Sequence, residues 1–259
     1  MDMEQSTQLL PEDKGDALSQ DEMVGSEDSD NVDSLETCSC CVHKFATPCG
    51  VMIYGCSQSG KSSLTAEIIL QRRHLFKNPP VSVIYIYSCW QQRFNQLQQV
   101  LGDDITFQTT IPSTDELEEL YSTHSIHRLI IIDDKIQSFT KNNQDLLKLA
   151  AVTSHHCLYT VFYISQSIFH SQLLREVSLN CKYLFLFQNP RSQQQIRILG
   201  SQIFGPGQQD YFIDAFNKSV LARRYGYLVI DLDKDTPAKY RLKSCILSTE
   251  DLIVYLPLK

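Results

Sequence analysis

Residues 55–62 read GCSQSGKS, and this stretch decides the fold. It matches the pattern GxxxxGK[ST], in which glycines let a tight loop close around phosphate groups. The apolar run Val51–Tyr54 comes directly before it and predicts a buried strand. A strand, a glycine loop and a helix start in this order place backbone N–H groups and a helix N-terminus around a polyphosphate. The sequence therefore predicts a nucleotide-binding loop.

The positions of this loop have separate predicted tasks. Gly55 and Gly60 supply the tight backbone path, and Lys61 reaches the β- and γ-phosphates. The Ser62 hydroxyl binds Mg²⁺, so the cofactors that we expect are ATP and Mg²⁺. The full set of predicted nucleotide contacts is Gly55, Ser57, Gln58, Ser59, Gly60, Lys61, Ser62 and Ser63.

A second apolar run ends in two acids. Residues 128–134 read RLIIIDD, which is typical of a central parallel strand that is buried on both faces. Ligands of open α/β sheets bind at the carboxyl ends of the strands, so this end should lie beside the phosphate loop. We predict that Asp133 holds Mg²⁺ from outside the innermost ring of its ligands and that Asp134 polarises the attacking water. The alternative is that the two acids only cap the next segment.

Strands and helices alternate around these two motifs. We expect a helix over 61–75, a strand over 81–87, a helix over 91–101, a strand over 105–108 and a helix opened by residues 113–116. Since 72 residues separate Lys61 from Asp133, at least one full strand intervenes. The pattern indicates an α/β P-loop NTPase with a mostly parallel central sheet flanked by helices, of the additional-strand (ASCE) division. It disfavours kinase-like and GTPase-like folds.

A later strand carries another candidate. Residues 158–166 read LYTVFYISQ, and a polar side chain at the end of this strand would lie next to the γ-phosphate. Gln166 is thus a candidate sensor that hydrogen-bonds the phosphate or the attacking water. The alternative is a plain strand-end glutamine. We expect further strands at 183–187 and 227–231, with residues 239–242 leading into another.

Length and charge indicate one folded domain with a tail. The 259 residues carry a net charge of −7, whereas residues 1–37 hold 12 acids and one base and carry −11. The rest of the chain therefore carries +4, which permits a nucleic-acid partner. We expect residues 1–37 to be a disordered acidic tail, 38–47 a cysteine-containing linker and 48–259 the ATPase domain.

The sequence indicates neither a membrane-spanning segment nor a standard zinc site. No stretch approaches the roughly 20 apolar residues that cross a bilayer, and the acidic N-terminus does not fit a secretory signal, so we expect a soluble intracellular protein without membrane contact. Cys38, Cys40 and Cys41 lie near His43 and Cys49, but the CxCC spacing matches no standard zinc finger. We expect free thiols there.

The order of the motifs resembles a known family. The segments that carry the resemblance are GCSQSGKSS (55–63), LIIIDD (129–134), FYISQSIF (162–169), LREVSLNCKYLFLFQNPRSQQQIRIL (174–199) and YGYLVIDLDKDTPAKYRL (225–242). Together they look like the genome-packaging ATPases of large eukaryotic DNA viruses and of Maverick/Polinton-type (adintovirus-like) elements. These are similar to the poxviral packaging ATPase and belong to the FtsK/HerA group of pumping motors. The resemblance covers about residues 48–247.

The resemblance implies roles for individual residues. Lys61 and Ser62 match the nucleotide-binding pair of the family, and Asp133 matches its magnesium acid. Asp134 matches the catalytic carboxylate, where many relatives in the wider group carry the longer Glu. Gln166 matches the polar sensor.

The resemblance also implies an assembly. Motors of this group work as rings, usually hexamers, in which an arginine of one subunit completes the catalytic site of its neighbour. The best candidates for this arginine are Arg175 and Arg191, because both follow the strand that carries the sensor. Poorer candidates are Arg197, Arg223 and Arg224.

The implied function is an ATP-hydrolysing motor that moves double-stranded DNA into a preformed capsid. Its partners would be the DNA backbone and capsid proteins, and it would act in the host nucleus, a cytoplasmic viral factory or the virion. A motor that tracks the DNA backbone needs cations facing phosphates, and the chain offers residues 72–74, Lys141 and residues 223–224. Two alternatives stay open: a DNA helicase or remodelling ATPase, and a nucleotide-gated capsid-assembly protein with little turnover.

Overall fold

The computed structural model describes residues 43–134, 143–167 and 171–257. The chain divides into two units, Met1–Asp33 and Ser34–Lys259, and all described residues belong to the second. The predicted acidic tail, the cysteines at 38, 40 and 41, and Lys141 lie outside the described residues. The predicted domain boundaries at residues 37 and 47 therefore stay a prediction.

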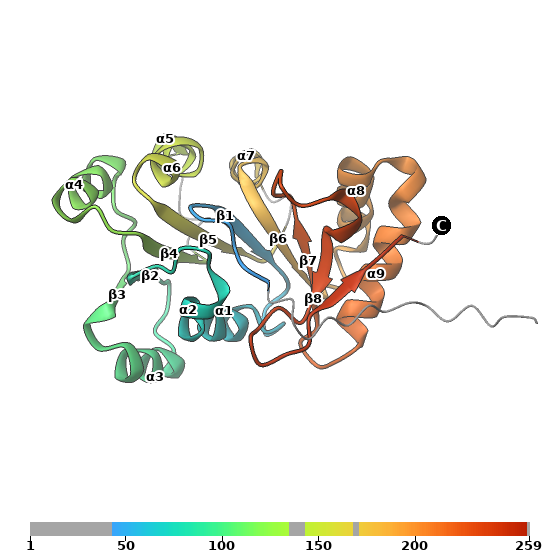
Figure 1. Ribbon diagram of the computed structural model, residues 1–259, viewed down its shortest axis with the longest axis horizontal. Coiled ribbons are helices and arrows are strands. Elements are labelled where there is room, and N and C mark those ends of the chain that lie inside the picture. The colour runs from blue at the N-terminus through green and yellow to red at the C-terminus, as the bar shows by residue number, and fades with distance from the viewer. Residues whose placement is uncertain (1–42, 135–142, 168–170, 258–259) are drawn as a thin grey trace, which may run out of the picture. The chain divides into compact units, whose positions relative to one another are not determined.

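A single sheet runs through the described part of the chain (Figure 1). Its nine strands lie in the order β3-β2-β4-β5-β1-β6-β7-β8-β9. Neighbours from β3 to β6 pair in parallel, and β7 to β9 add an antiparallel edge. The bounds of the strands are β1 Gly50–Tyr54, β2 Ser82–Ile86, β3 Ile105–Gln108, β4 Arg128–Asp133, β5 Tyr159–Ser165, β6 Cys181–Phe187, β7 Tyr227–Asp231, β8 Leu242–Ser244 and β9 Ile253–Tyr255.

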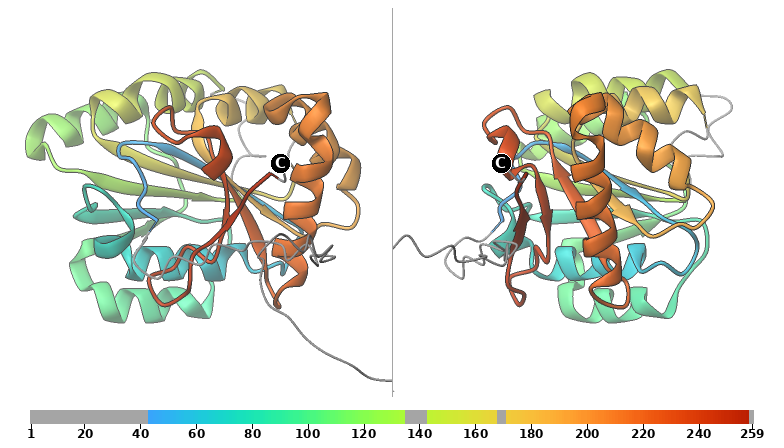
Figure 2. Two further views of the ribbon diagram at one scale, coloured as in Figure 1. Left: turned by 45° about the vertical axis from the view of Figure 1, so that its right-hand side comes forward. Right: turned by 90° about the vertical axis from the view of Figure 1, so that its right-hand side faces the viewer.

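Helices cover both faces of the sheet (Figures 1 and 2). One face packs against α1 (Lys61–Leu70), α2 (Arg72–Leu75) and α3 (Gln92–Leu101). The other face packs against α4 (Thr114–His124), α5 (Asn143–Lys148), α6 (Ser154–His156), α7 (Gln172–Leu179), α8 (Gln193–Phe204) and α9 (Gln209–Leu221). None of the helices in the described ranges is long and apolar enough to span a membrane.

Alternating side chains along the strands build two separate cores. In β1, Met52 and Tyr54 belong to the core beneath α4 to α9, whereas Val51 and Ile53 belong to the core beneath α1 to α3. Successive side chains of a strand point to opposite faces, so a continuous apolar run fills both cores. Side-chain packing on both faces of the sheet therefore fixes β1 and β4, which lead into the phosphate loop and the acid pair.

The structure confirms the predicted α/β architecture with a mostly parallel sheet and an additional strand. It corrects the reason for the additional strand. The sequence places β2 and β3 between the two motifs, but in the sheet these strands lie beyond β4. The strand that separates β1 from β4 is β5, which follows both motifs in the chain. The spacing along the chain thus predicted the additional-strand division correctly, but it attributed the additional strand to β2 or β3 instead of β5.

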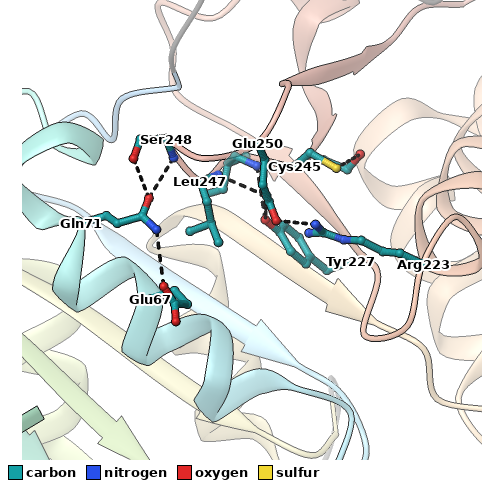
Figure 3. Close-up of polar contacts among 10 residues, drawn as sticks. Glu67, Gln71, Arg223, Tyr227, Cys245, Leu247, Ser248 and Glu250 are labelled. Carbon is teal, nitrogen blue, oxygen red and sulfur yellow. Dashed lines mark hydrogen bonds and ion pairs between the residues drawn. The ribbon is translucent and has the colours of Figure 1, made fainter. Parts of the chain in front are cut away.

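The predicted helix over 61–75 is interrupted at Gln71. This residue leaves the helical conformation, with φ −94° and ψ 13°. Its side-chain oxygen accepts hydrogen bonds from the backbone N–H and the hydroxyl of Ser248, both at 2.8 Å (Figure 3). The next residue, Arg72, is buried and forms an ion pair with Asp104 at 2.8 Å. Arg72 is thus a structural residue, and its buried guanidinium is engaged by Asp104 instead of facing solvent.

The start of α4 yields a stability prediction. The Ser113 hydroxyl accepts from the Glu116 backbone N–H at 3.2 Å, and the Glu116 carboxylate accepts from the Ser113 N–H at 2.7 Å. This reciprocal cap satisfies two amide groups that the helix leaves free. Ser113→Ala should lower the free energy of unfolding by about 1 kcal/mol in urea denaturation. Ser122→Ala, on the exposed side of the same helix, should change it little. Equal stability of the two variants would contradict this role of the cap.

Candidate functional site

The loop after β1 requires glycine at both of its ends. Gly60 has φ +104°, and a Cβ atom there would come within 2.8 Å of the Tyr225 Cβ. A Cβ atom on Gly55 would come within 2.6 Å of the Phe187 Cβ. The Gly60 carbonyl accepts the first hydrogen bond of α1, from the Leu64 N–H at 2.9 Å. Glycine therefore permits both the turn and the close packing that start the helix at Lys61.

The Lys61 ammonium group lies inside this loop. The residue is only 6% exposed, and its Nζ donates to the backbone carbonyls of Gly55 and Cys56, each at 2.8 Å. Burial lowers the pKa of Lys61, and the carboxylates of Asp134 and Asp133 act in the opposite direction. The loop thus holds a cation in place at its centre.

Asp133, the last residue of β4, lies buried beside the helix start. The Tyr85 hydroxyl donates to the Asp133 Oδ2 at 2.8 Å, and the Ser62 hydroxyl donates to the same oxygen at 3.5 Å. Burial raises the pKa of the Asp133 carboxyl, whereas the bond from Tyr85 lowers it and the neighbouring Asp134 raises it. Sequence reasoning missed Tyr85, whose only signal was a tyrosine within the apolar run 81–87.

Asp134 and Gln166 meet at the same edge of the sheet. The Gln166 Nε2 donates to the Asp134 Oδ2 at 3.1 Å. Both residues are exposed, and Asp134 adopts a left-handed backbone with φ 51°. Because β5 lies between β1 and β4, Gln166 follows a strand that neighbours both motifs. The predicted acid and the predicted sensor are therefore in direct contact.

A cavity of about 560 Å³ lies between the phosphate loop and the two acids, and we call it the phosphate-loop cavity. Gln166 contacts Asp134 but is not among the residues that line this cavity. Eight of the predicted site residues line it: Ser57, Gln58, Gly60, Lys61, Ser62, Ser63, Asp133 and Asp134. Its other lining residues are Tyr87, Ser88, Cys89, Gln91, Arg93 and Tyr225, none of which the sequence analysis selected. Of the remaining predicted loop positions, Gly55 is buried at the start of the loop, and the Ser59 hydroxyl lacks a hydrogen-bond partner among the described residues.

The cavity has suitable ligands for one Mg²⁺ ion. A Ser62 hydroxyl and an Asp133 carboxylate lie within 3.5 Å of each other, and both are oxygen donors of the kind that Mg²⁺ prefers. The raised pKa of Asp133 reflects a buried negative charge that a cation would offset. Within the described ranges, no group of three or more His, Cys, Asp or Glu side chains is placed to hold a metal.

The two preferred catalytic arginines are exposed and stand apart from the cavity lining. Arg175, on α7, lines a different groove together with Leu179 and Ile198. Arg191 follows β6, and its backbone N–H donates to the Asn189 side chain at 3.2 Å. The Asn189 amide in turn donates to the Gln166 carbonyl at 3.5 Å. The structure thus brings the loop of Arg191 to Gln166, the predicted sensor, and neither arginine is among the residues that line the cavity.

A third arginine candidate is occupied elsewhere. Arg223 forms an ion pair with Glu250, and its guanidinium lies 5.2 Å from the centre of the Tyr227 ring (Figure 3). These contacts fix the turn between α9 and β7, which carries Tyr225 to the phosphate loop. Arg223 thus supports the site from outside.

Structural comparison relates the fold to known proteins. The genome packaging NTPase B204 from Sulfolobus turreted icosahedral virus 2, in complex with sulfate, has a TM-score of 0.51 and 14% identity, over 82% of this chain and 98% of that chain. Its complex with AMPPCP gives the same values. No protein-family model and no curated protein matches the chain. The chain therefore shares the P-loop NTPase fold of B204, which confirms the predicted fold class.

The buried Asp133 carboxylate yields a prediction about pH. Since its pKa is raised in the folded protein, its negative charge destabilises the fold at neutral pH. Asp133→Asn removes the charge and keeps an oxygen that can accept from Tyr85. We expect the free energy of unfolding at pH 7 to be higher for Asp133→Asn than for the wild type. The gain should shrink as the pH falls, because the wild-type carboxyl then becomes protonated.

Urea denaturation of both proteins between pH 7 and pH 4 checks this prediction. The matched control is Asp251→Asn, which removes the same charge from an exposed position. A constant difference across this pH range, or a less stable Asp133→Asn protein at pH 7, would contradict it.

Proposed function

We propose that this chain is an ATP-hydrolysing motor that translocates double-stranded DNA and packages a viral genome into a capsid. The observation that carries the proposal is the meeting of Lys61, the two acids and Gln166 at one sheet edge, in the fold of B204. B204 is a genome packaging NTPase whose structure is known in complex with AMPPCP, a nucleotide analogue. The site and the fold point to the same chemistry.

The phosphate-loop cavity would bind the triphosphate of ATP. Gly60, with its left-handed backbone, precedes the N-terminus of α1, whose free backbone N–H groups would bind phosphate oxygens, and Lys61 would add a positive charge. Ser62 and Asp133 would hold Mg²⁺, which when bound neutralises charge on phosphate oxygens. Tyr85 keeps the Asp133 carboxylate oriented toward Ser62, because it donates to the same oxygen.

Asp134 and Gln166 would position the attacking water. Asp134 is exposed at the cavity edge, where its carboxylate can accept a proton from water. Gln166 donates to one of the two Asp134 oxygens and leaves the other available. This bond orients the carboxylate before water arrives, so less reorganisation is needed during the reaction.

Translocation would require a ring and cations outside the cavity. An arginine that completes a neighbouring site must be exposed and absent from its own cavity, and both Arg175 and Arg191 meet these conditions. Arg73, His74 and Arg224 are exposed and remain candidates for contact with the DNA backbone. We propose a homo-oligomeric ring, a hexamer by analogy with related motors. It would act with capsid proteins where capsids assemble in the infected cell, in its nucleus or a cytoplasmic factory, or in the virion.

The motor hypothesis predicts that duplex DNA stimulates ATP hydrolysis. Lys61→Ala removes the cation at the centre of the loop and should lower the stimulated rate by about 10²- to 10³-fold. Steady-state ATPase assays with and without linear duplex DNA measure this. Mass determination with a non-hydrolysable ATP analogue should reveal the ring. A wild-type monomer whose ATPase ignores DNA would contradict the motor, and unwinding of a forked duplex would favour a helicase.

Asp134→Asn separates hydrolysis from binding. The substitution keeps the size of the side chain and a hydrogen-bonding oxygen but removes the base, so steady-state turnover should fall by about 10²- to 10⁴-fold. Calorimetric titration should show nearly unchanged ATP affinity. Wild-type turnover as slow as that of the variant would instead indicate a nucleotide-gated assembly protein.

A further inference from the structure

Arg93 extends from α3 into the phosphate-loop cavity. Its guanidinium NH1 donates to the Ser63 hydroxyl at 2.8 Å, and Ser63 lies in the first turn of α1. The Arg93 side chain is half-buried and is part of the cavity lining. The sequence indicated only a polar helix over residues 91–101. The structure brings a second cation to the cavity beside Lys61.

The segment that carries Arg93 is anchored to the acid pair. Phe94, the next residue, is fully buried and packs 4.8 Å from the Tyr85 ring and 5.1 Å from the Phe107 ring, measured between ring centroids. Tyr85 is also the residue that donates to Asp133. One aromatic side chain therefore supports both the start of α3 and the predicted metal ligand. This fixes Arg93 relative to the acids at low entropic cost.

No carboxylate among the described residues matches the charge of Arg93. A guanidinium offers five N–H donors, and the bond to Ser63 uses one. In the described part of the chain, Arg93 has no carboxylate within ion-pair distance. Burial raises the pKa of Tyr85 well above its ordinary value, Asp133 raises it further, and the Arg93 charge acts in the opposite direction. Arg93 thus acts electrostatically on the acid side of the cavity and keeps free donors there.

We propose that Arg93 is a phosphate-binding residue, contributed in cis by α3, that contacts the polyphosphate of the nucleotide. The inference rests on the proposed nucleotide site. A guanidinium can donate two parallel hydrogen bonds to phosphate oxygens. Its single bond to the Ser63 hydroxyl leaves enough N–H donors for such a pair. Arg93, on α3, and Lys61, at the start of α1, would then both contact the polyphosphate. This role is distinct from that of an arginine supplied by a neighbouring subunit, because Arg93 already lines the cavity of its own chain.

Calorimetric titration with Mg²⁺-ATP tests the proposal on the full-length protein. We expect Arg93→Ala to weaken ATP binding by about 10- to 100-fold, which is the usual effect of a charged hydrogen bond. Arg93→Lys keeps the charge but not the paired donors and should give an intermediate affinity. Wild-type affinity should also fall more steeply with ionic strength than that of Arg93→Ala, because one fewer charge contacts the ligand.

Two controls make the result specific. Lys77→Ala removes the same charge from an exposed site outside the cavity lining and should bind ATP like the wild type. Trp90, the single tryptophan, packs 5.4 Å from the Phe94 ring, so an unchanged Trp90 emission spectrum shows that α3 is correctly packed. Wild-type affinity and salt dependence in a correctly packed Arg93→Ala protein would overturn this inference alone. A wild-type protein that does not bind ATP would overturn the proposed function as well.

Discussion

Backbone pairing of β5 with both β1 and β4 is the constraint on which the rest of the site depends. The Gly55 N–H donates to the Ser165 carbonyl at 3.3 Å, and the Asp134 N–H donates to the Ile164 carbonyl at 3.4 Å. Two adjacent residues at the end of β5 thus fix the positions of the phosphate loop and the acids along the strand direction, and Gln166 follows directly after them. Since all three strands are buried on both faces, a shift of one relative to another would disrupt both cores.

This frame allows charged groups to lie where isolated charges would be costly. Lys61 and Asp133 are both almost fully buried. Burial lowers the pKa of Lys61 and raises the pKa of Asp133, so it favours the neutral form of both residues. Loop carbonyls hold Lys61, and hydroxyl groups hold Asp133, so each charge has polar partners before a ligand arrives. The remaining electrostatic cost is what a bound polyphosphate and its metal would relieve. Stability and ligand binding are therefore opposed at these two residues.

The sequence predicted the parts of this arrangement that depend on local pattern. The loop, the acidic strand and the strand before Gln166 were recognisable because continuous, mostly apolar runs that end at a glycine, an acid or an amide allow few other structures. Contacts between distant segments were not predictable in this way. Tyr85 and Arg93 join the site through pairing of β2 with β4 and packing of α3 against α1, and neither has a local signature. For the same reason, the sequence did not predict that β5 is the additional strand. Nor did it predict the break at Gln71, whose side chain bonds to the distant Ser248.

The choice of aspartate at position 134 follows from the backbone at that point. The chain leaves β4 with φ 51° at this residue, a left-handed conformation that Asp tolerates better than longer side chains, since its short carboxylate can hydrogen-bond locally. A Glu here would reach one methylene further but fit this turn less well. Gln166 offsets the shorter reach by donating directly to the carboxylate, which fixes its direction. The predicted acid and the predicted sensor are thus held together: the backbone conformation favours aspartate at position 134, and Gln166, which follows the neighbouring strand, orients its carboxylate.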